Sequence, residues 1–228
     1  MRASLFLFAL AFCCSNYAAA QIDQVASGLG DDKIVAGLKD ALQVSTARAV
    51  ALAGKRDGFL NNEDIRILLP PKLQAVGKSL RLIGMGDQVD ELEIGMNRAA
   101  EQATPQAKEI FLAALRKMTV NDARRVLTGG DTAATEYFQA TCAADLTAAF
   151  SPVVHRSMEK LGVVRQYARV IKNAPGGSVL ANEFDLDKYV VSKTLDGLFY
   201  MLGQEEAKIR RNPAAQSTEL LKEVFGGR

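Results

Sequence analysis

Apolar residues recur every three or four positions along most of this chain, which is the period of an amphipathic α-helix. The first such stretch runs from about residue 31 to Ala53, and Gly54 follows it. Asp31 or Asp32 is placed to cap this helix, and Gly54 is placed to end it. The apolar residues that share one stripe of this helix are Ile34, Leu38, Ala41, Leu42, Ala49 and Leu52.

Capping residues and prolines divide the rest of the chain into further helical segments. Residues 174–183, with Pro175-Gly176-Gly177, predict a loop, and Asn212-Pro213 predicts a break before a last amphipathic segment. The whole pattern predicts an all-α, multi-helix bundle of roughly nine helices. The predicted helix starts are Pro70-Pro71, Asp87, Thr104-Pro105, Thr119, Asp131, Ser151-Pro152 and Asp185.

Residues 55–69 lack the helical period. Asp57-Gly58 and Asn61-Asn62 are turn-forming pairs, and Ile65, Ile67 and Leu69 then alternate with their neighbours. We therefore expect a short extended arm near residues 57–69. Such an arm either covers a ligand-binding groove between helices or straps the core, and we favour the strap because loops usually pack locally.

The first twenty residues have the pattern of a cleavable secretory signal peptide. Arg2 precedes an apolar run over residues 4–14, and Ala18-Ala19-Ala20 provides the small residues that a signal peptidase needs before Gln21. The run is shorter than the roughly 20 residues that span a bilayer. Cys13 and Cys14 do not follow the small residue that lipidation requires. We therefore expect residues 21–228 to form a single exported helical domain with no transmembrane segment.

Charge and cysteine content narrow the functional classes. The chain has 28 Lys and Arg against 26 Asp and Glu, so loss of Arg2 with the signal leaves 27 against 26. This near-balance gives no electrostatic case for binding nucleic acid. Only Cys142 remains after cleavage, so an intramolecular disulfide is impossible. We expect Cys142 to be a small buried side chain, the alternatives being an intermolecular disulfide or a reactive thiol.

Familiar catalytic and cofactor motifs are missing from the sequence. His155 is the one histidine, and no G-x-S-x-G pattern presents a serine. One histidine and one mature cysteine supply too few of the ligands that zinc prefers. Gly77-Lys78-Ser79 resembles the end of a phosphate-binding loop, but Lys72 stands where that loop needs glycine. We predict no catalytic, cofactor-binding or metal-binding residues.

A run of cations towards the C-terminal half suggests a binding surface. Its members recur at helical spacing, so they share one side of their helices and could contact anionic lipid or an acidic partner. The alternative is an ordinary solvated face. The cations are Arg156, Lys160, Arg165, Arg169 and Lys172, and the apolar residues expected on the other side are Val154, Met158, Leu161, Val164, Ala168 and Ile171.

Four separate motifs resemble the bacterial family called domain of unknown function 4197. They occur in order over nearly the whole mature chain, from about residue 31 to 226. The resemblance implies an exported, all-helical protein of Gram-negative bacteria, some members being lipoproteins, and it implies no activity and no catalytic residues. The motifs are DGFLNN with IRI, LP and KL (57–73), MNRAAE (96–101), LTGGDTAAT (127–135), and FDL with YV and LDGLF (184–199).

The polar residues of these motifs form a candidate cluster: if they converge they mark a site, and otherwise they cap helices and tie loops. We expect a non-enzymatic, periplasmic binding or envelope-associated protein whose partner is an apolar small molecule, an anionic lipid surface or an envelope protein. The alternatives are a structural subunit of an envelope complex and a hydrolase of envelope glycan that uses two carboxylates. The candidate cluster is Asn61, Asn62, Arg66, Asn97, Arg98, Asp131 and Thr132, and the candidate carboxylates are Asp57, Glu63, Asp131, Glu136, Asp196 and Glu205.

Overall fold

The structure is a computed structural model that describes residues 31–172 and 184–211. These residues form helices joined by short turns and contain no β-strand, so the predicted all-α class is confirmed. The predicted signal peptide, the predicted loop at 174–183 and the segment after Asn212 lie outside the described residues. The elements are α2 (Asp31–Gly54), α3 (Pro71–Leu82), α4 (Gly86–Ala103), the 3-10 turn η1 (Thr104–Gln106), α5 (Ala107–Lys117), α6 (Val120–Thr128), α7 (Ala133–Lys160), α8 (Val163–Lys172) and α10 (Leu186–Arg211).

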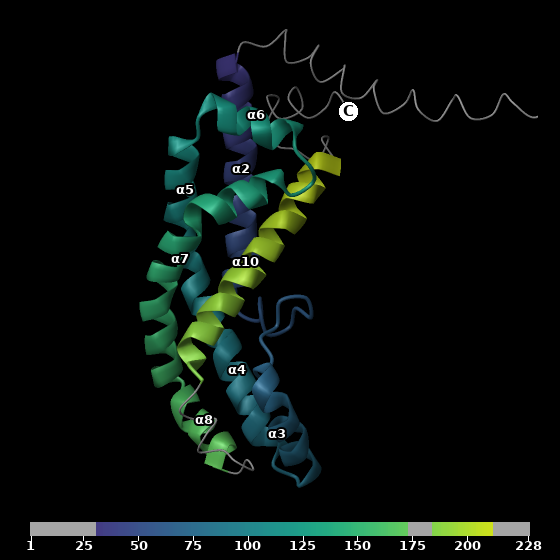
Figure 1. Cartoon of the computed structure of the whole chain (residues 1–228), viewed down its shortest axis with the longest axis vertical. Helices are drawn as coiled ribbons and strands as arrows, with labels where there is room; N and C mark the ends of the chain where they lie inside the picture. The colour runs from purple at the N-terminus through teal and green to yellow at the C-terminus, as the bar shows by residue number, and fades with distance from the viewer. Residues whose placement is uncertain (1–30, 173–183, 212–228) are drawn as a thin grey trace, which may run out of the picture.

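The helices pack into an elongated bundle around two long helices. α10 lies against α7 and α2, while α4 lies against α7 and α8 (Figure 1). α5 and α6 lie towards one end of the bundle, and α3 and α8 lie towards the other (Figure 1). Every helix contributes to one cluster of buried apolar side chains, in which the ring of Phe111 contacts those of Phe138 and Phe199 at centroid distances of 5.0 and 6.4 Å. No helix in the described ranges is long and apolar enough to cross a membrane.

Several helix starts depend on local capping and match the sequence. The Thr119 hydroxyl accepts a hydrogen bond from the Asp122 backbone amide, and the Asp122 carboxylate accepts one from the Thr119 amide. This reciprocal pair is a capping box, and it begins α6 as predicted. Asp185 likewise caps α10, since its carboxylate accepts from the Lys188 amide at 3.0 Å.

Other predicted starts are wrong. Asp87 lies inside the first turn of α4, whose N-cap is Met85, and it makes no capping bond. The Thr104 hydroxyl donates to the Ala100 carbonyl at 2.8 Å instead of capping α5, because η1 joins α4 directly to α5. α7 begins at Ala133 rather than Asp131.

The chain does not restart at Ser151-Pro152, because Pro152 lies inside α7. Proline costs an interior hydrogen bond, but Phe150 and Val154 on either side of it are fully buried. Packing of this apolar face therefore holds the helix together across the proline. This merger is one reason why the described residues contain fewer helices than the roughly nine predicted.

Candidate functional site

The predicted extended arm is only partly correct, because residues 56–61 and 63–65 form hydrogen-bonded turns and only residues 66–70 are free of them. The arm is fastened to α4 by the side chain of Asn97. The Asn97 amide oxygen accepts from the Ile67 backbone amide at 2.8 Å, and its nitrogen donates to the Ile67 carbonyl at 2.8 Å. The same nitrogen donates to the Glu93 carbonyl at 2.8 Å. Asn97 is completely buried, so it pairs with Ile67 much as a neighbouring β-strand would. This pairing satisfies a buried piece of backbone that no strand accompanies.

Two glutamates continue this contact along α4, one turn on each side of Asn97. Glu93 accepts from the Leu69 amide at 3.2 Å, and Glu101 accepts from the amides of Phe59 and Leu60 at 3.2 Å each. The spacing of four residues places all three side chains on one side of the helix. The buried carboxylates are thus hydrogen-bonded to backbone, which is the condition under which burial is tolerated.

Charge pairs and a close helix contact fix the N-terminal end of the arm. Arg98 pairs with Asp57 at 2.6 Å and with Glu101 at 2.7 Å, and these hydrogen bonds and charges raise the pKa of Arg98 against the opposing effect of burial. Phe59 is fully buried against Gly197 of α10, where an added Cβ would lie 2.5 Å from the Phe59 ring. The arm is therefore a strap clamped between α4 and α10.

Asp131 and Thr132 lie at a different place, the junction of α6 and α7. Asp131 pairs with Arg211 at 2.9 Å, and Thr132 donates to Glu136 at 3.0 Å. The start of α7 is capped from α10, since the buried Glu206 carboxylate accepts from the amides of residues 134 and 135 at 2.8 Å each. Arg210 binds Glu206 and also donates to the Val126 carbonyl, so this cluster holds three helices together.

The seven candidate motif residues therefore do not converge on one site. Asn97, Arg98 and Arg66 contact the strap or its glutamates, with Arg66 lying 3.6 Å from Glu93. Asn61 and Asn62 line a separate shallow hollow of about 480 Å³ beside Met201. The motifs in these described residues are mainly architectural.

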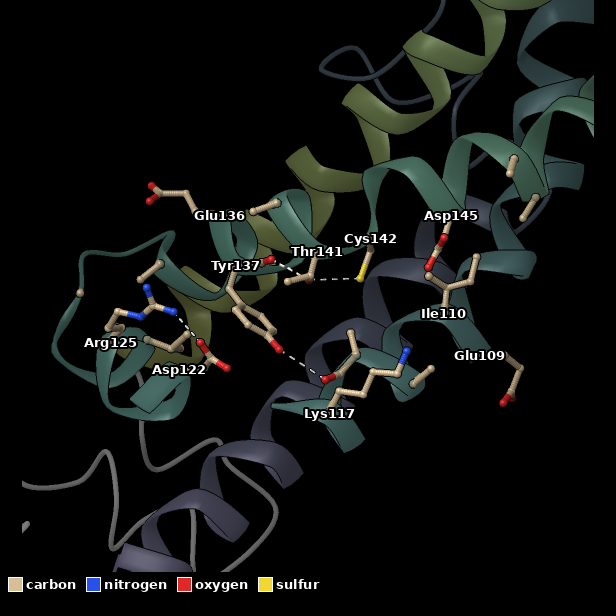
Figure 2. A pocket seen from close by; sticks show the side chains of 18 of the residues that line it. Glu109, Ile110, Lys117, Asp122, Arg125, Glu136, Tyr137, Thr141, Cys142 and Asp145 are labelled. Carbon is tan, nitrogen blue, oxygen red and sulfur yellow. Dashed lines mark hydrogen bonds and ion pairs between the residues drawn. The ribbon is translucent and has the colours of Figure 1, made fainter. Parts of the chain in front are cut away.

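A wide groove runs along α5 and α7 and is closed at one end by α6 (Figure 2). We call it the α5–α7 groove, and its volume is about 1080 Å³. Many of the positions that face it carry alanine, whose small side chain leaves space between the helices. The apolar lining residues are Ile110, Ala113, Ala114, Val126, Ala133, Ala140, Ala148 and Ala149.

Polar groups lie at the centre of the α5–α7 groove. The Tyr137 hydroxyl donates to the Ala114 carbonyl at 3.4 Å, and burial raises the pKa of Tyr137. The Thr141 hydroxyl donates to the Tyr137 carbonyl at 2.8 Å and lies 3.5 Å from the Cys142 sulfur (Figure 2). Burial raises the pKa of the Cys142 thiol, which is the opposite of what a reactive cysteine needs.

The charged rim of the α5–α7 groove is predominantly acidic. Asp122 and Arg125 pair with each other, which leaves Lys117 as the other cation of the lining (Figure 2). The remaining carboxylates of the lining are Glu109, Glu136 and Asp145. A groove with this rim attracts a positively charged ligand, admits a neutral one and repels an anionic one.

The candidate cationic face is exposed at the opposite end of the bundle. All five predicted cations are exposed, and no carboxylate of the described residues forms an ion pair with any of them. The expected apolar side is only partly correct: Val154, Met158 and Ile171 are buried, but Val164 is 51% exposed and Ala168 is also exposed. α8 therefore presents cations and small apolar side chains together to the solvent.

Sequence reasoning missed the buried charges and the groove. Glu93, Asn97 and Glu101 recur every four residues beside an apolar seam, and that polar row was the available signal. Glu206 and Arg210 have the same spacing on α10, but nothing local indicates that α6 and α7 meet them. The groove had only the weak signal of alanines at helical spacing.

The fold and the groove define an all-α protein with an open groove on the side of a helical bundle. The family model described as "Protein of unknown function (DUF4197)" matches residues 28–226. The chain therefore belongs to this family, and the resemblance seen in its motifs is confirmed. No curated protein and no solved structure matches the chain.

Proposed function

We propose that this protein is an exported, non-enzymatic binding protein whose α5–α7 groove takes an elongated, largely apolar molecule of neutral or positive charge. The observation that carries the proposal is the groove itself, an open hollow of about 1080 Å³ between packed helices. Ligand pockets in proteins are typically hollows of about 300–1,000 Å³ with an apolar lining and a few placed polar groups. The site has this character.

The ligand class follows from the lining. Alanine side chains leave room for a ligand to lie close to the backbones of α5 and α7, and Ile110 and Val126 supply apolar contacts. Tyr137 and Thr141 place hydroxyls at the middle of the groove. Unpaired carboxylates at the rim, such as Asp145, favour a positively charged group at one end of the ligand.

A binding role, rather than catalysis, is supported because the polar motif residues make structural contacts. Asn97, Arg98 and Glu101 hold the strap, so they are not free to face a substrate. The carboxylates weighed for a glycan hydrolase are spread over the strap, the start of α7 and α10, and several are paired with cations. Asp57 pairs with Arg98, Asp131 with Arg211, Asp196 with Lys193 and Glu205 with Lys208.

The proposed location is the periplasm of a Gram-negative bacterium. It rests on the signal-peptide pattern of residues 1–20, which predicts cleavage before Gln21. The intact mass of the chain after expression with the native leader tests it. A periplasmic protein with the mass of residues 21–228 supports export. A protein that stays in the cytoplasmic fraction with the mass of the full chain contradicts it.

Native mass spectrometry of protein purified from the periplasm tests the groove. We expect a bound molecule whose mass is released on unfolding, and we expect Ala140→Leu to remove it by filling the groove. Ala75→Leu is the matched control, because Ala75 is exposed on α3 and lies outside the groove. Ligand that is retained equally by Ala140→Leu, or no bound ligand in any preparation, would contradict the proposal.

A further inference from the structure

The turn between α3 and α4 exposes two neighbouring large apolar side chains. Leu82 is 88% exposed and Ile83 is 68% exposed, more than any other large apolar side chain of the described residues. Single exposed apolar residues are ordinary, but an adjacent pair at the tip of a turn is not needed for packing. We call Leu82 and Ile83 the apolar tip.

The backbone holds the apolar tip outward. The Met85 amide donates to the Leu80 carbonyl at 2.8 Å, and the Gly84 amide donates to the Arg81 carbonyl at 3.3 Å. Gly84 has a φ of +79°, the left-handed conformation that glycine adopts readily. These are the features of a Schellman motif, which closes a helix with a defined turn. Leu82 and Ile83 are therefore presented to solvent by a fixed turn.

The cationic face lies at the same end of the bundle as the apolar tip. α8 and the α3–α4 turn are both at the lower end in Figure 1, and α3 contacts α8. On α8, Arg165, Arg169 and Lys172 are exposed on the side opposite to the buried Val163 and Val170. This helix therefore turns its charges away from the core.

Exposed apolar side chains accompany these cations. Leu161, at the C-terminal end of α7, is 37% exposed, and Val164 and Ala168 of α8 are also exposed. Helices that lie in the interface of a membrane combine cations with apolar side chains that enter the headgroup region. The solvent side of α8 has this composition on a small scale.

Carboxylates close to the apolar tip reduce the net positive charge at this end of the bundle, but α8 itself remains positively charged. Asp87, Asp90 and Glu91 lie in the first turns of α4, and Arg81 pairs with Asp90. Glu159 lies 3.5 Å from His155. The unpaired cations of α7 and α8 are therefore the principal source of attraction for an anionic surface.

We propose that this end of the protein docks on an anionic lipid bilayer, with Leu82 and Ile83 inserted among the lipids and the α7–α8 cations against the phosphates. A fluid bilayer admits two apolar side chains that project from a turn, and the cations supply attraction before insertion. The inference is independent of the proposed ligand. The lining of the groove ends at Ala149 and the cations of α7 begin at Arg156, about 10 Å further along the helix at about 1.5 Å per residue, so the two surfaces do not share residues.

The protein contains no tryptophan, which allows a single-tryptophan reporter of insertion. We expect the emission of mature Ile83→Trp protein to shift to the blue, and to be quenched by brominated acyl chains, on vesicles containing phosphatidylglycerol. Val120→Trp is the control, since Val120 is an exposed apolar residue at the start of α6, towards the other end (Figure 1). Vesicle binding of the Ile83→Trp protein without any change in its emission would overturn the insertion.

Co-flotation with the same vesicles tests the cations. Neutralising Arg165, Arg169 and Lys172 to glutamine is expected to weaken partitioning about 100-fold, at about a fivefold loss per cation. The control neutralises Arg48, Lys55 and Lys108, which are exposed elsewhere, and is expected to change binding little.

The double variant Leu82→Ser and Ile83→Ser is expected to partition onto these vesicles about 30-fold more weakly, because two apolar side chains no longer enter the bilayer. Equal losses in the two cation variants would mean that attraction is non-specific and would overturn the assignment to α8. Wild-type protein that fails to bind phosphatidylglycerol vesicles at low salt would overturn the whole inference. Neither result bears on ligand retention in the α5–α7 groove.

Discussion

Replacing Asn97 by alanine tests whether the strap is an integral part of the fold. Asn97 makes three hydrogen bonds of 2.8 Å, two of them to the backbone of Ile67, which is 1% exposed. The Asn97→Ala variant leaves the Ile67 amide and carbonyl buried without partners. Each such group costs about 1–3 kcal/mol, so we expect the free energy of unfolding to fall by about 2–6 kcal/mol.

Urea unfolding followed by circular dichroism measures this loss, and hydrogen exchange of the Ile67 amide locates it. Asn61→Ala is the matched control: Asn61 is an exposed residue of the same strap, so its loss should be within about 0.5 kcal/mol. A loss below about 1 kcal/mol for Asn97→Ala, with the Ile67 amide still protected, would refute the reasoning.

The Asn97→Asp variant refines the test, because a carboxylate keeps the acceptor for the Ile67 amide and loses the donor. Its second oxygen would then face the carbonyls of Ile67 and Glu93, two other acceptors. We expect a defect at least as large as that of alanine at neutral pH. Relative to the wild type, the defect should shrink as the pH falls and the carboxyl regains a proton to donate.

Three further predictions concern α10, α7 and the thiol. Gly197→Ala should lower the free energy of unfolding by about 1–3 kcal/mol, because the new Cβ would lie 2.5 Å from the Phe59 ring. Gly203→Ala on the same helix is the control: its Cβ meets no atom closer than 3.7 Å, so thermal melts should show a neutral or stabilising effect. His155 and Asp187 share a hydrogen bond of 2.6 Å, and this bond and the charges of Asp187 and Glu159 raise the pKa of His155. The protonated form of His155 is therefore favoured in the folded state. The resulting stabilisation is complete below the ordinary pKa of 6.5 and is lost as the pH rises through the raised pKa. His155→Gln should therefore flatten the pH dependence of the urea midpoint above pH 6.5. Cys142 is 1% exposed, so a maleimide should label it slowly in native protein and quickly in urea, while Cys142→Ala/Thr141→Cys protein, with its thiol at an exposed position, should be labelled quickly in both.

Local features of the fold could be predicted from the sequence because they depend on neighbouring residues. Thr119 and Asp122 bond to each other's backbone, and Asp185 caps a helix three residues away. Cys142 lies in the core as expected, on the buried side of α7 that also carries Phe138 and Leu146. Pro152 was misleading, since its local preference to break a helix is outweighed by packing on both sides.

The remaining features depend on contacts between distant segments. Asn97 meets Ile67 across thirty residues, and Glu206 caps α7 from more than seventy residues away. The resemblance of the motifs identified the family, yet the motif polar residues make separate structural contacts rather than forming one site. The α5–α7 groove arises from how α5, α6 and α7 meet, and no short pattern records that arrangement.

The most direct test of the proposed function is the affinity of the mature protein for octylammonium compared with octyl sulfate, measured by isothermal titration calorimetry. The two probes have the same alkyl chain and opposite charge. The difference between their affinities therefore reports the acidic rim of the α5–α7 groove, and the effect of Ala140→Leu reports its apolar lining. We predict that octylammonium binds the wild type, that octyl sulfate binds at least about tenfold more weakly, and that Ala140→Leu removes the ammonium signal. Tighter binding of the sulfate, or octylammonium binding unchanged by Ala140→Leu, would contradict the account.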